Sequence, residues 1–217
     1  MKEAPIRKQE ALLIRRGKAV FIGFALALAT GCAFRVPINE PATLPSSAQK
    51  RPLSVSVHVS DTIRDLAIEH PSVVPCFATF TADVGAVITQ SLTKVMEQSF
   101  EKVVHSAARA QALSGSQYHF AFLPAQFMAS ANLMSIDNVA ADVRISLLVQ
   151  VSDAKGKKII ETIVGGQSRV QKDRFPPLAG CEKRTLDVLG PAIEQAISSM
   201  LDDFARNVLA SDQLAAH

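Results

Sequence analysis

The side chains of this chain that could do acid–base chemistry are scattered along its 217 residues. His58 and His119 both fall in segments that we expect to be strands. A lone histidine on a strand is more often a packed or surface residue than a catalytic one. Asp202 and Asp203 are adjacent carboxylates, but neighbouring positions on a helix point apart. These groups therefore form no general acid–base pair.

Motifs for nucleophilic, phosphate-binding or metal-dependent catalysis are missing from the sequence. Ser114-Gly115-Ser116 comes nearest to a nucleophile elbow, and it lacks a second glycine at the required spacing. No phosphate loop, HExxH or CxxC sequence is present. We therefore expect a non-catalytic protein with no metal site and no cofactor.

The three cysteines carry the remaining chemistry, and Cys32 ends a targeting segment. A basic start is followed by Ala19 to Thr30, an uncharged and predominantly apolar run of twelve residues. A charged start, a short apolar run and small residues before a cleavage point are typical of a secretory signal peptide. The alternative is an uncleaved anchor, although a membrane-spanning helix needs roughly 20 apolar residues. We expect residues 1–31 to be removed as a signal peptide.

Ala29-Thr30-Gly31-Cys32 resembles the lipobox of bacterial lipoproteins, with Ala29 at the place where that pattern usually has leucine. The resemblance implies that the Cys32 thiol is diacylated, that the chain is cut before it, and that the new amine is acylated. Two or three acyl chains anchor a protein durably, because each buried methylene contributes about 0.8 kcal/mol. Ala33, in a position where aspartate retains lipoproteins at the inner membrane, implies the periplasmic face of the outer membrane.

Removal of residues 1–31 changes the charge of the protein. The whole chain has 23 basic and 20 acidic side chains, and the removed segment holds six and two of them. The mature chain therefore keeps 17 basic and 18 acidic side chains. Nothing in this balance points to nucleic acid, and we expect the membrane to be contacted through the N-terminal lipid.

Cys76 and Cys181 form an even pair in a chain that we expect to be exported. An oxidising compartment favours a disulfide between them, and both stand beside turn-forming residues. Such a bridge would contribute up to about 4–5 kcal/mol on the chain-entropy model. The alternative is two separate buried thiols. A metal site is not expected, because no histidine stands at ligand spacing from either cysteine.

The mature chain divides by composition into three parts. Residues 32–52, from Cys32 to Pro52, contain four prolines and predict an extended tether that could reach about 60–70 Å. The folded body is expected from Leu53 to Leu209, and residues 210–217 are expected to be a flexible tail.

Hydrophobic periodicity predicts the elements of this body. Strands are expected at 53–60, 77–81, 118–124, 139–152 and 158–164, the last two forming a hairpin. Helices are expected at 84–104 and from Thr185 or Pro191 to Val208. Gly165-Gly166 suggests a bulge or the end of a strand, and residues 167–184 a polar loop. The fold class is therefore α+β, with an antiparallel sheet of about four strands and two helices packed on one face.

With its valine strand LSVSVHV and its hairpin SLLVQVSDAKGKKIIETIVG, the chain resembles the YajG-like lipoproteins of Gram-negative bacteria. Auxiliary lipoproteins of lipid-trafficking transport systems share a similar plan. Two functions stay open. The first is binding of a protein partner in a cell-envelope assembly, which predicts an exposed edge or apolar patch. The second is handling of a lipid or other hydrophobe, which predicts an apolar cavity lined by Phe120, Phe122 and Phe127.

Overall fold

The computed structural model describes residues 32–39, 50–71, 78–107, 115–135, 138–173 and 180–214. These residues form an α+β protein with two open sheets, one of three strands and one of five. The two long helices of this part of the chain are α3 (Val84–Ser99) and α4 (Cys181–Phe204). The α+β class predicted from the sequence is confirmed, although the sheet arrangement differs from the prediction.

The larger sheet mixes parallel and antiparallel pairing. Strands β5 (Phe100–His105), β2 (Arg51–Val59) and β6 (Tyr118–Ser135) run parallel to one another. By contrast, β6, β7 (Asn138–Asp153) and β8 (Lys158–Asp173) are antiparallel. The prediction of an antiparallel sheet of about four strands was therefore wrong. Parallel neighbours need a crossover connection, and the segment that contains α3 links β2 to β5. In spatial order the strands are β5, β2, β6, β7 and β8.

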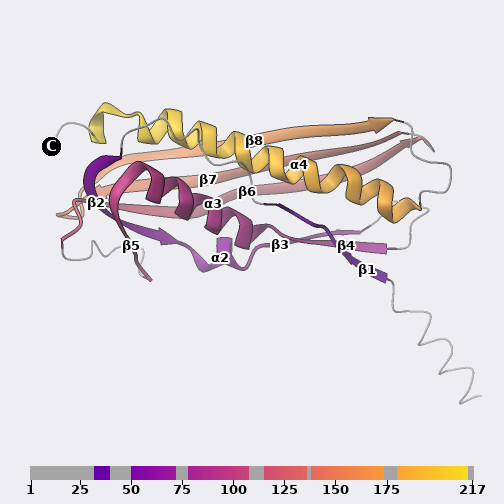
Figure 1. The fold of residues 1–217 in the computed structure, drawn as a ribbon, viewed down its shortest axis with the longest axis horizontal. Coiled ribbons are helices and arrows are strands. Elements are labelled where there is room, and N and C mark those ends of the chain that lie inside the picture. Colours follow the sequence, from indigo (N-terminus) through magenta and orange to yellow (C-terminus); the bar gives the residue numbers. More distant parts are fainter. Residues whose placement is uncertain are drawn as a thin grey trace, which may run out of the picture.

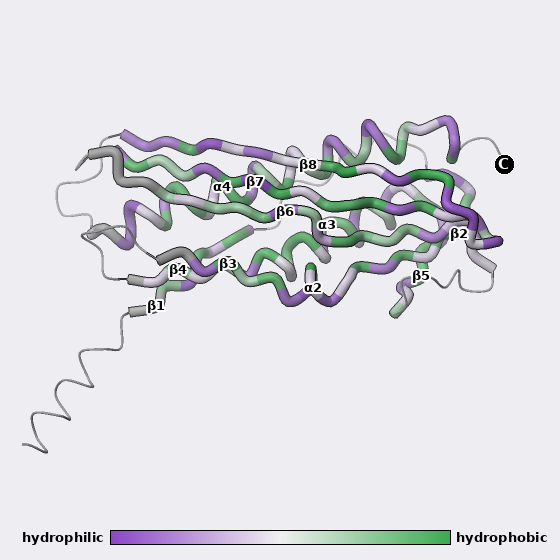
Figure 2. Tube along the Cα trace, turned by 180° about the vertical axis from the view of Figure 1, so that it is seen from behind, coloured by the Kyte–Doolittle hydropathy of each residue, from purple (hydrophilic) through white to green (hydrophobic). Residues whose placement is uncertain are grey.

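Both long helices cover the same face of the five-stranded sheet (Figure 1), as the sequence predicted. Alternation along β7 separates the two faces. Val143, Leu147 and Val149 are completely buried on the helix side, whereas Arg144 and Leu148 lie on the other side. Figure 2 shows that other side, where no helix lies in front of β6, β7 and β8.

The close contact between α4 and β8 depends on Gly166. A Cβ at this position would lie 1.9 Å from the Ala196 carbonyl oxygen and 2.5 Å from the Met200 backbone nitrogen. Only glycine allows the helix backbone to approach the strand so closely. The predicted bulge or strand end at Gly165-Gly166 was wrong, because β8 continues through both glycines to Asp173. Residues 167–173 are therefore strand, and Cys181–Arg184 is helix, where a polar loop was predicted.

The predicted helix 84–104 is shorter in the structure. Asp83 accepts a hydrogen bond from the Ala86 backbone nitrogen (3.4 Å) and caps the start of α3, which ends at Ser99. Phe100 then begins β5, which pairs with β2, and its ring packs 5.5 Å from that of Phe120. The apolar residues of this segment fit a helical face as well as a strand, and sheet pairing decides between the two.

Two prolines that complicate the sequence pattern sit inside regular elements. The register of β6 shifts between Pro124 and Gln126, so that Ala125 forms a bulge. The bulge reverses the parity of the following residues, and the strand continues to Ser135. Pro191 lies inside α4, which begins at Cys181 and so extends further than either predicted start.

The smaller sheet consists of β1 (Cys32–Arg35), β4 (Ala78–Asp83) and β3 (Ala67–Pro71), in that order. A short helix, α2 (Asp61–Arg64), precedes β3. The prediction that the tether begins directly after Cys32 was wrong. Residues 32–39 belong to the folded body because they complete a sheet and contribute Val36 to the core. Residues 40–49 lie outside the described part of the chain.

The C-terminal end also belongs to the body. A π-helical turn (Ala205–Leu209) and a 3-10 turn (Asp212–Leu214) follow α4. The Leu214 side chain is only 2% exposed, so the predicted flexible tail was wrong for residues 210–214. No helix in the described residues combines the length and apolar composition that crossing a membrane requires.

Candidate functional site

Cys32, the predicted lipid attachment point, is the first residue of β1. Its backbone is the register partner of Ala78 in a parallel ladder that runs to Arg35 and Thr81. β3 pairs with the other side of β4, in the antiparallel sense. The residue predicted to hold the lipid is therefore itself part of a three-stranded sheet.

The residues just after β1 are fixed to the body. The Val36 side chain is 3% exposed, and its backbone nitrogen donates to the Thr81 carbonyl oxygen at 2.8 Å. The Asn39 backbone and side-chain nitrogens both donate to Glu194 Oε1 of α4, at 2.7 and 3.0 Å. A Cβ at Gly190 would lie 2.7 Å from the Pro37 carbonyl oxygen. Residues 36–39 are therefore packed between β4 and α4.

Side chains of β1 add further contacts with β4. The Phe34 ring stacks on the Phe80 ring at a centroid distance of 6.0 Å, and Phe80 is completely buried. Arg35 Nη2 lies 3.3 Å from Asp83 Oδ2, with both side chains largely in solvent. An exposed ion pair of this kind stabilises little, so the ring contact and Val36 contribute most of the stabilisation.

A groove of about 390 Å³ lies between this N-terminal segment and α3. One wall is the chain just after Cys32, and the other is the first turns of the helix. Its polar groups are Arg35, Asp83 and Gln90, and its remaining surface is aliphatic. It is lined by Arg35, Val36, Pro37, Ile38, Asp83, Ala86, Val87 and Gln90. It could hold a small amphiphile, but it offers no nucleophile beside a base.

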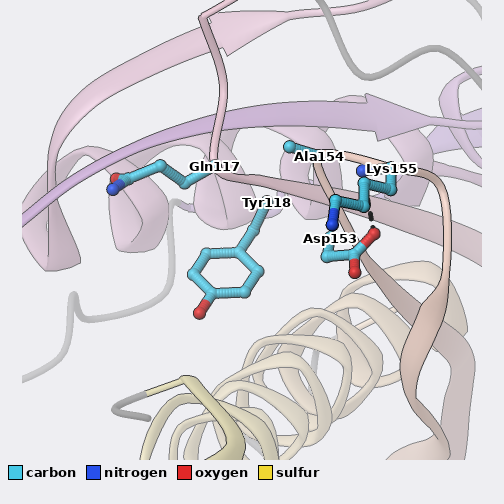
Figure 3. A pocket seen from close by; sticks show the side chains of 5 residues that line it. All are labelled: Gln117, Tyr118, Asp153, Ala154 and Lys155. Carbon is cyan, nitrogen blue, oxygen red and sulfur yellow. Dashed lines mark hydrogen bonds between the residues drawn. The ribbon is translucent and has the colours of Figure 1, made fainter. Parts of the chain in front are cut away.

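A second hollow, of about 280 Å³, lies at the turn between β7 and β8 and is shown in Figure 3. Its one carboxylate is Asp153, whose Oδ1 accepts from the backbone nitrogens of Lys155 and Lys157, at 2.9 Å each. That carboxylate therefore holds the turn together. The Tyr118 ring points from β6 toward the C-terminal helices, away from Asp153 (Figure 3), so the two groups do not converge.

The three phenylalanines predicted to line a cavity lie on the helix-covered face of β6 instead. Phe120 and Phe122 are completely buried. Their rings pack against Phe100 and Phe204, at centroid distances of 5.5 and 5.4 Å. Phe127 is half-buried and packs against the same core. Neither hollow is lined by any of the three, so their predicted binding role stays a prediction that these pockets do not support.

The histidine pattern gave no hint of a buried pair on the opposite face of the sheet. Ser56 Oγ of β2 lies 2.8 Å from His119 Nδ1 of β6, because the two residues are register partners. The His58 Nδ1 lies 3.2 Å from the Ser106 carbonyl oxygen. Ser56 is completely buried and His119 is 2% exposed, so a substrate could not reach this serine. The pair satisfies polar groups within the sheet.

The predicted disulfide is only partly within the described structure. Cys76 lies outside it, two residues before β4, and Cys181 is the first residue of α4. Figure 1 places the start of β4 and the start of α4 toward the same end of the molecule. The bridge therefore stays a prediction. No cluster of three or more His, Cys, Asp or Glu side chains that could hold a metal occurs in the described ranges.

Comparisons with known proteins find partial overlaps of structure with solved proteins. No protein-family model and no curated protein sequence matches the chain. A minor lipoprotein from Acinetobacter baumannii aligns over 75% of this chain and 94% of its own, at 11% identity and a TM-score of 0.37. A candidate lipoprotein from Caulobacter crescentus CB15 aligns over 59% of this chain and 85% of its own, at 14% identity and a TM-score of 0.30. Overlaps this loose carry no argument about what this chain does.

Proposed function

We propose that this protein is a non-catalytic lipoprotein, anchored through Cys32 to the periplasmic face of the outer membrane, that binds a protein partner in a cell-envelope assembly. The observation that carries the anchoring is the position of Cys32. The pattern Ala29-Thr30-Gly31-Cys32 ends at the residue with which β1 begins. Cleavage before Cys32 would leave every described strand in place, and acyl chains on its sulfur would hold the whole body at a bilayer.

The outer face of the five-stranded sheet supports the partner. Leu123, Leu148 and Ile163 are register partners on three neighbouring strands, and they form a row across the face that no helix covers. Ile163 is 61% exposed, and Met128 on the same face is 55% exposed. Leu123 and Leu148 are half-buried, so the row is a partly exposed apolar patch. Contiguous apolar patches of this kind mark sites where another protein is bound.

Handling of a lipid or other hydrophobe is the second candidate. The groove beside residues 35–38 supports it, because its walls are partly aliphatic and it lies near the anchor. Phe120 and Phe122 weigh against it, since their rings fill the core rather than line a cavity. The exposed row on the sheet therefore favours the protein partner.

The anchoring is tested by replacing the attachment point. Cys32→Ser should move the protein from the membrane fraction of a Gram-negative host into the soluble fraction. Ala33→Ser, which keeps the cysteine, should leave it in the membrane. Intact mass of the mature protein should show acyl chains on a chain that begins at Cys32. Unchanged membrane retention of C32S, with no added hydrocarbon mass on the native chain, would refute the anchor.

The partner is tested by photo-crosslinking in cells. A photoreactive residue at position 163 should give one crosslinked species, whereas the same residue at Glu97, exposed on α3, should give none. Leu148→Gln in the same chain should weaken the crosslink from position 163. If positions 163 and 97 give the same products, the outer face of the sheet does not bind a partner.

A further inference from the structure

We infer that the body stands directly on the bilayer surface, with the end of the molecule that holds Cys32 against the lipid headgroups and the β7–β8 turn farthest from them. This inference rests on the proposed anchoring and adds to it an orientation of the body on the membrane. Three features of the described residues carry it: the short chain between anchor and core, the place of Cys32 in the fold, and the length of the sheet.

The chain between the anchor and the core is too short to act as a spacer. Val36 is in the core only four residues after Cys32, a stretch that could span at most about 14 Å. The real freedom is smaller, because Cys32 through Arg35 form a strand paired with β4. A lipid on Cys32 is therefore separated from the folded body by little more than its own side chain.

The same contacts restrict rotation of the body about its anchor. β1 is held by its ladder with β4 and by the stacking of Phe34 on Phe80. The residues that follow β1 are held by the two hydrogen bonds from Asn39 to Glu194. These contacts join the anchor to both sheet and helix. A single point of attachment on a flexible chain would allow any orientation, whereas this attachment fixes one end of the body toward the bilayer.

The anchored end is one end of the long axis. Figure 1 and Figure 2 both place the start of β1 there, together with the start of α4 and the end of β8. β7 runs from Asn138 at this end to Asp153 at the other, and its 16 residues span about 50 Å at roughly 3.3 Å per residue. The β7–β8 turn thus lies about 50 Å from the bilayer side. The Leu123, Leu148 and Ile163 row lies between the two ends, open to a partner approaching from the side.

The orientation is tested with the acylated protein, extracted from host membranes and returned to vesicles of phosphatidylethanolamine and phosphatidylglycerol. A fluorescent non-natural residue is placed at Gln171, near the anchored end, or at Ala154, in the distal turn; both positions are exposed. Energy transfer to an acceptor on the lipid headgroups should be several-fold more efficient from position 171 than from position 154. Equal transfer from the two positions would overturn the orientation.

A matched pair of insertions separates the orientation from the anchoring. Ten Gly-Ser residues inserted between Ala33 and Phe34 should bring the two transfer efficiencies together, because the body then turns freely. The same insertion between Lys155 and Gly156, in the distal turn, leaves the anchored end unchanged. Energy transfer from position 171 should therefore stay more efficient than energy transfer from position 154. If the protein carries no acyl mass or does not bind the vesicles, the proposed anchoring fails. If it is acylated and bound but position 171 shows no excess, only the orientation fails.

Discussion

The two faces of the five-stranded sheet are built from the same strands and differ in how far their apolar side chains are buried. On the helix side, Val143, Leu147 and Val149 are completely buried beneath the helix layer, where α4 packs against β7. On the outer side, Ile163 remains 61% exposed. The helix side supplies the stability of the body, because burial of apolar area is the main favourable term in folding. Apolar side chains on the outer side bury less area and so contribute less to stability, which leaves them available to the partner that we propose.

The largest difference between the faces should appear at the adjacent glycines of β8. Gly166→Ala pushes a Cβ into the backbone of α4, 1.9 Å from the Ala196 carbonyl oxygen, and should destabilise the protein by about 3–5 kcal/mol. Gly165→Ala is the control, since its Cβ would meet only ordinary contacts at 3.7 Å. Chemical denaturation of both variants measures the difference, and equal midpoints would contradict the close packing of α4.

The next effect should separate two neighbouring leucines of β7. Leu147→Ala removes a completely buried side chain and should reduce the free energy of unfolding by roughly 2–4 kcal/mol. Leu148→Ala removes a half-buried side chain from the outer face and should reduce it by less than about 1 kcal/mol. Urea unfolding followed by circular dichroism distinguishes them. A larger loss for the Leu148 variant would mean that the assignment of the two faces is reversed.

A smaller effect is expected where the N-terminal segment joins the helix layer. Glu194→Ala removes the acceptor of both Asn39 hydrogen bonds and should lower the free energy of unfolding by about 1–2 kcal/mol. Gln195→Ala, at an exposed neighbouring position, should have almost no effect. Hydrogen exchange should show faster exchange of the Val36 amide in the first variant only. Unchanged exchange at Val36 would mean that Glu194 does not hold the segment.

The smallest effect on stability should come from the exposed row itself. Ile163→Asp places a charge where the side chain is already 61% in solvent, so the free energy of unfolding should change by no more than about 0.5 kcal/mol. In the same variant, a photoreactive residue placed at position 148 should no longer crosslink to the partner. A loss of several kcal/mol would show that Ile163 belongs to the core and not to a binding face.

Local pattern predicted much of this fold. Alternation along 139–152 and the Asp153 to Gly156 turn gave the β7–β8 hairpin, and the apolar period after Val84 gave α3. The helical period also extends over residues 100–104, which form part of β5 instead, because their apolar positions fit either period and pairing with β2 selects the strand. The strand predicted at 118–124 is too short, since alternation alone does not reveal the bulge after Pro124 beyond which β6 continues to Ser135.

The candidate site was the part that sequence reasoning described least well. The apolar run before Cys32 predicts lipid attachment there, whereas the proline content of the residues after it predicts a tether. Phe34, Val36 and Ile38 do alternate with Arg35, Pro37 and Asn39, and this signal would have predicted a strand-like segment. The proline content of the segment argues against a strand, but Pro37 lies just past the end of β1, where no ladder hydrogen bond is needed.

Local sequence predicts lipid attachment at Cys32 and most of the helices and strands, because charge, apolar length and periodicity are properties of neighbouring residues. Three features follow from the folded arrangement and not from local pattern: residues 32–39 belong to the body, β2 lies between β5 and β6, and Gly166 lies against the backbone of α4. Each of these joins residues distant in the chain. Such contacts form where the folded surfaces fit, and that fit depends on the positions of all the elements together.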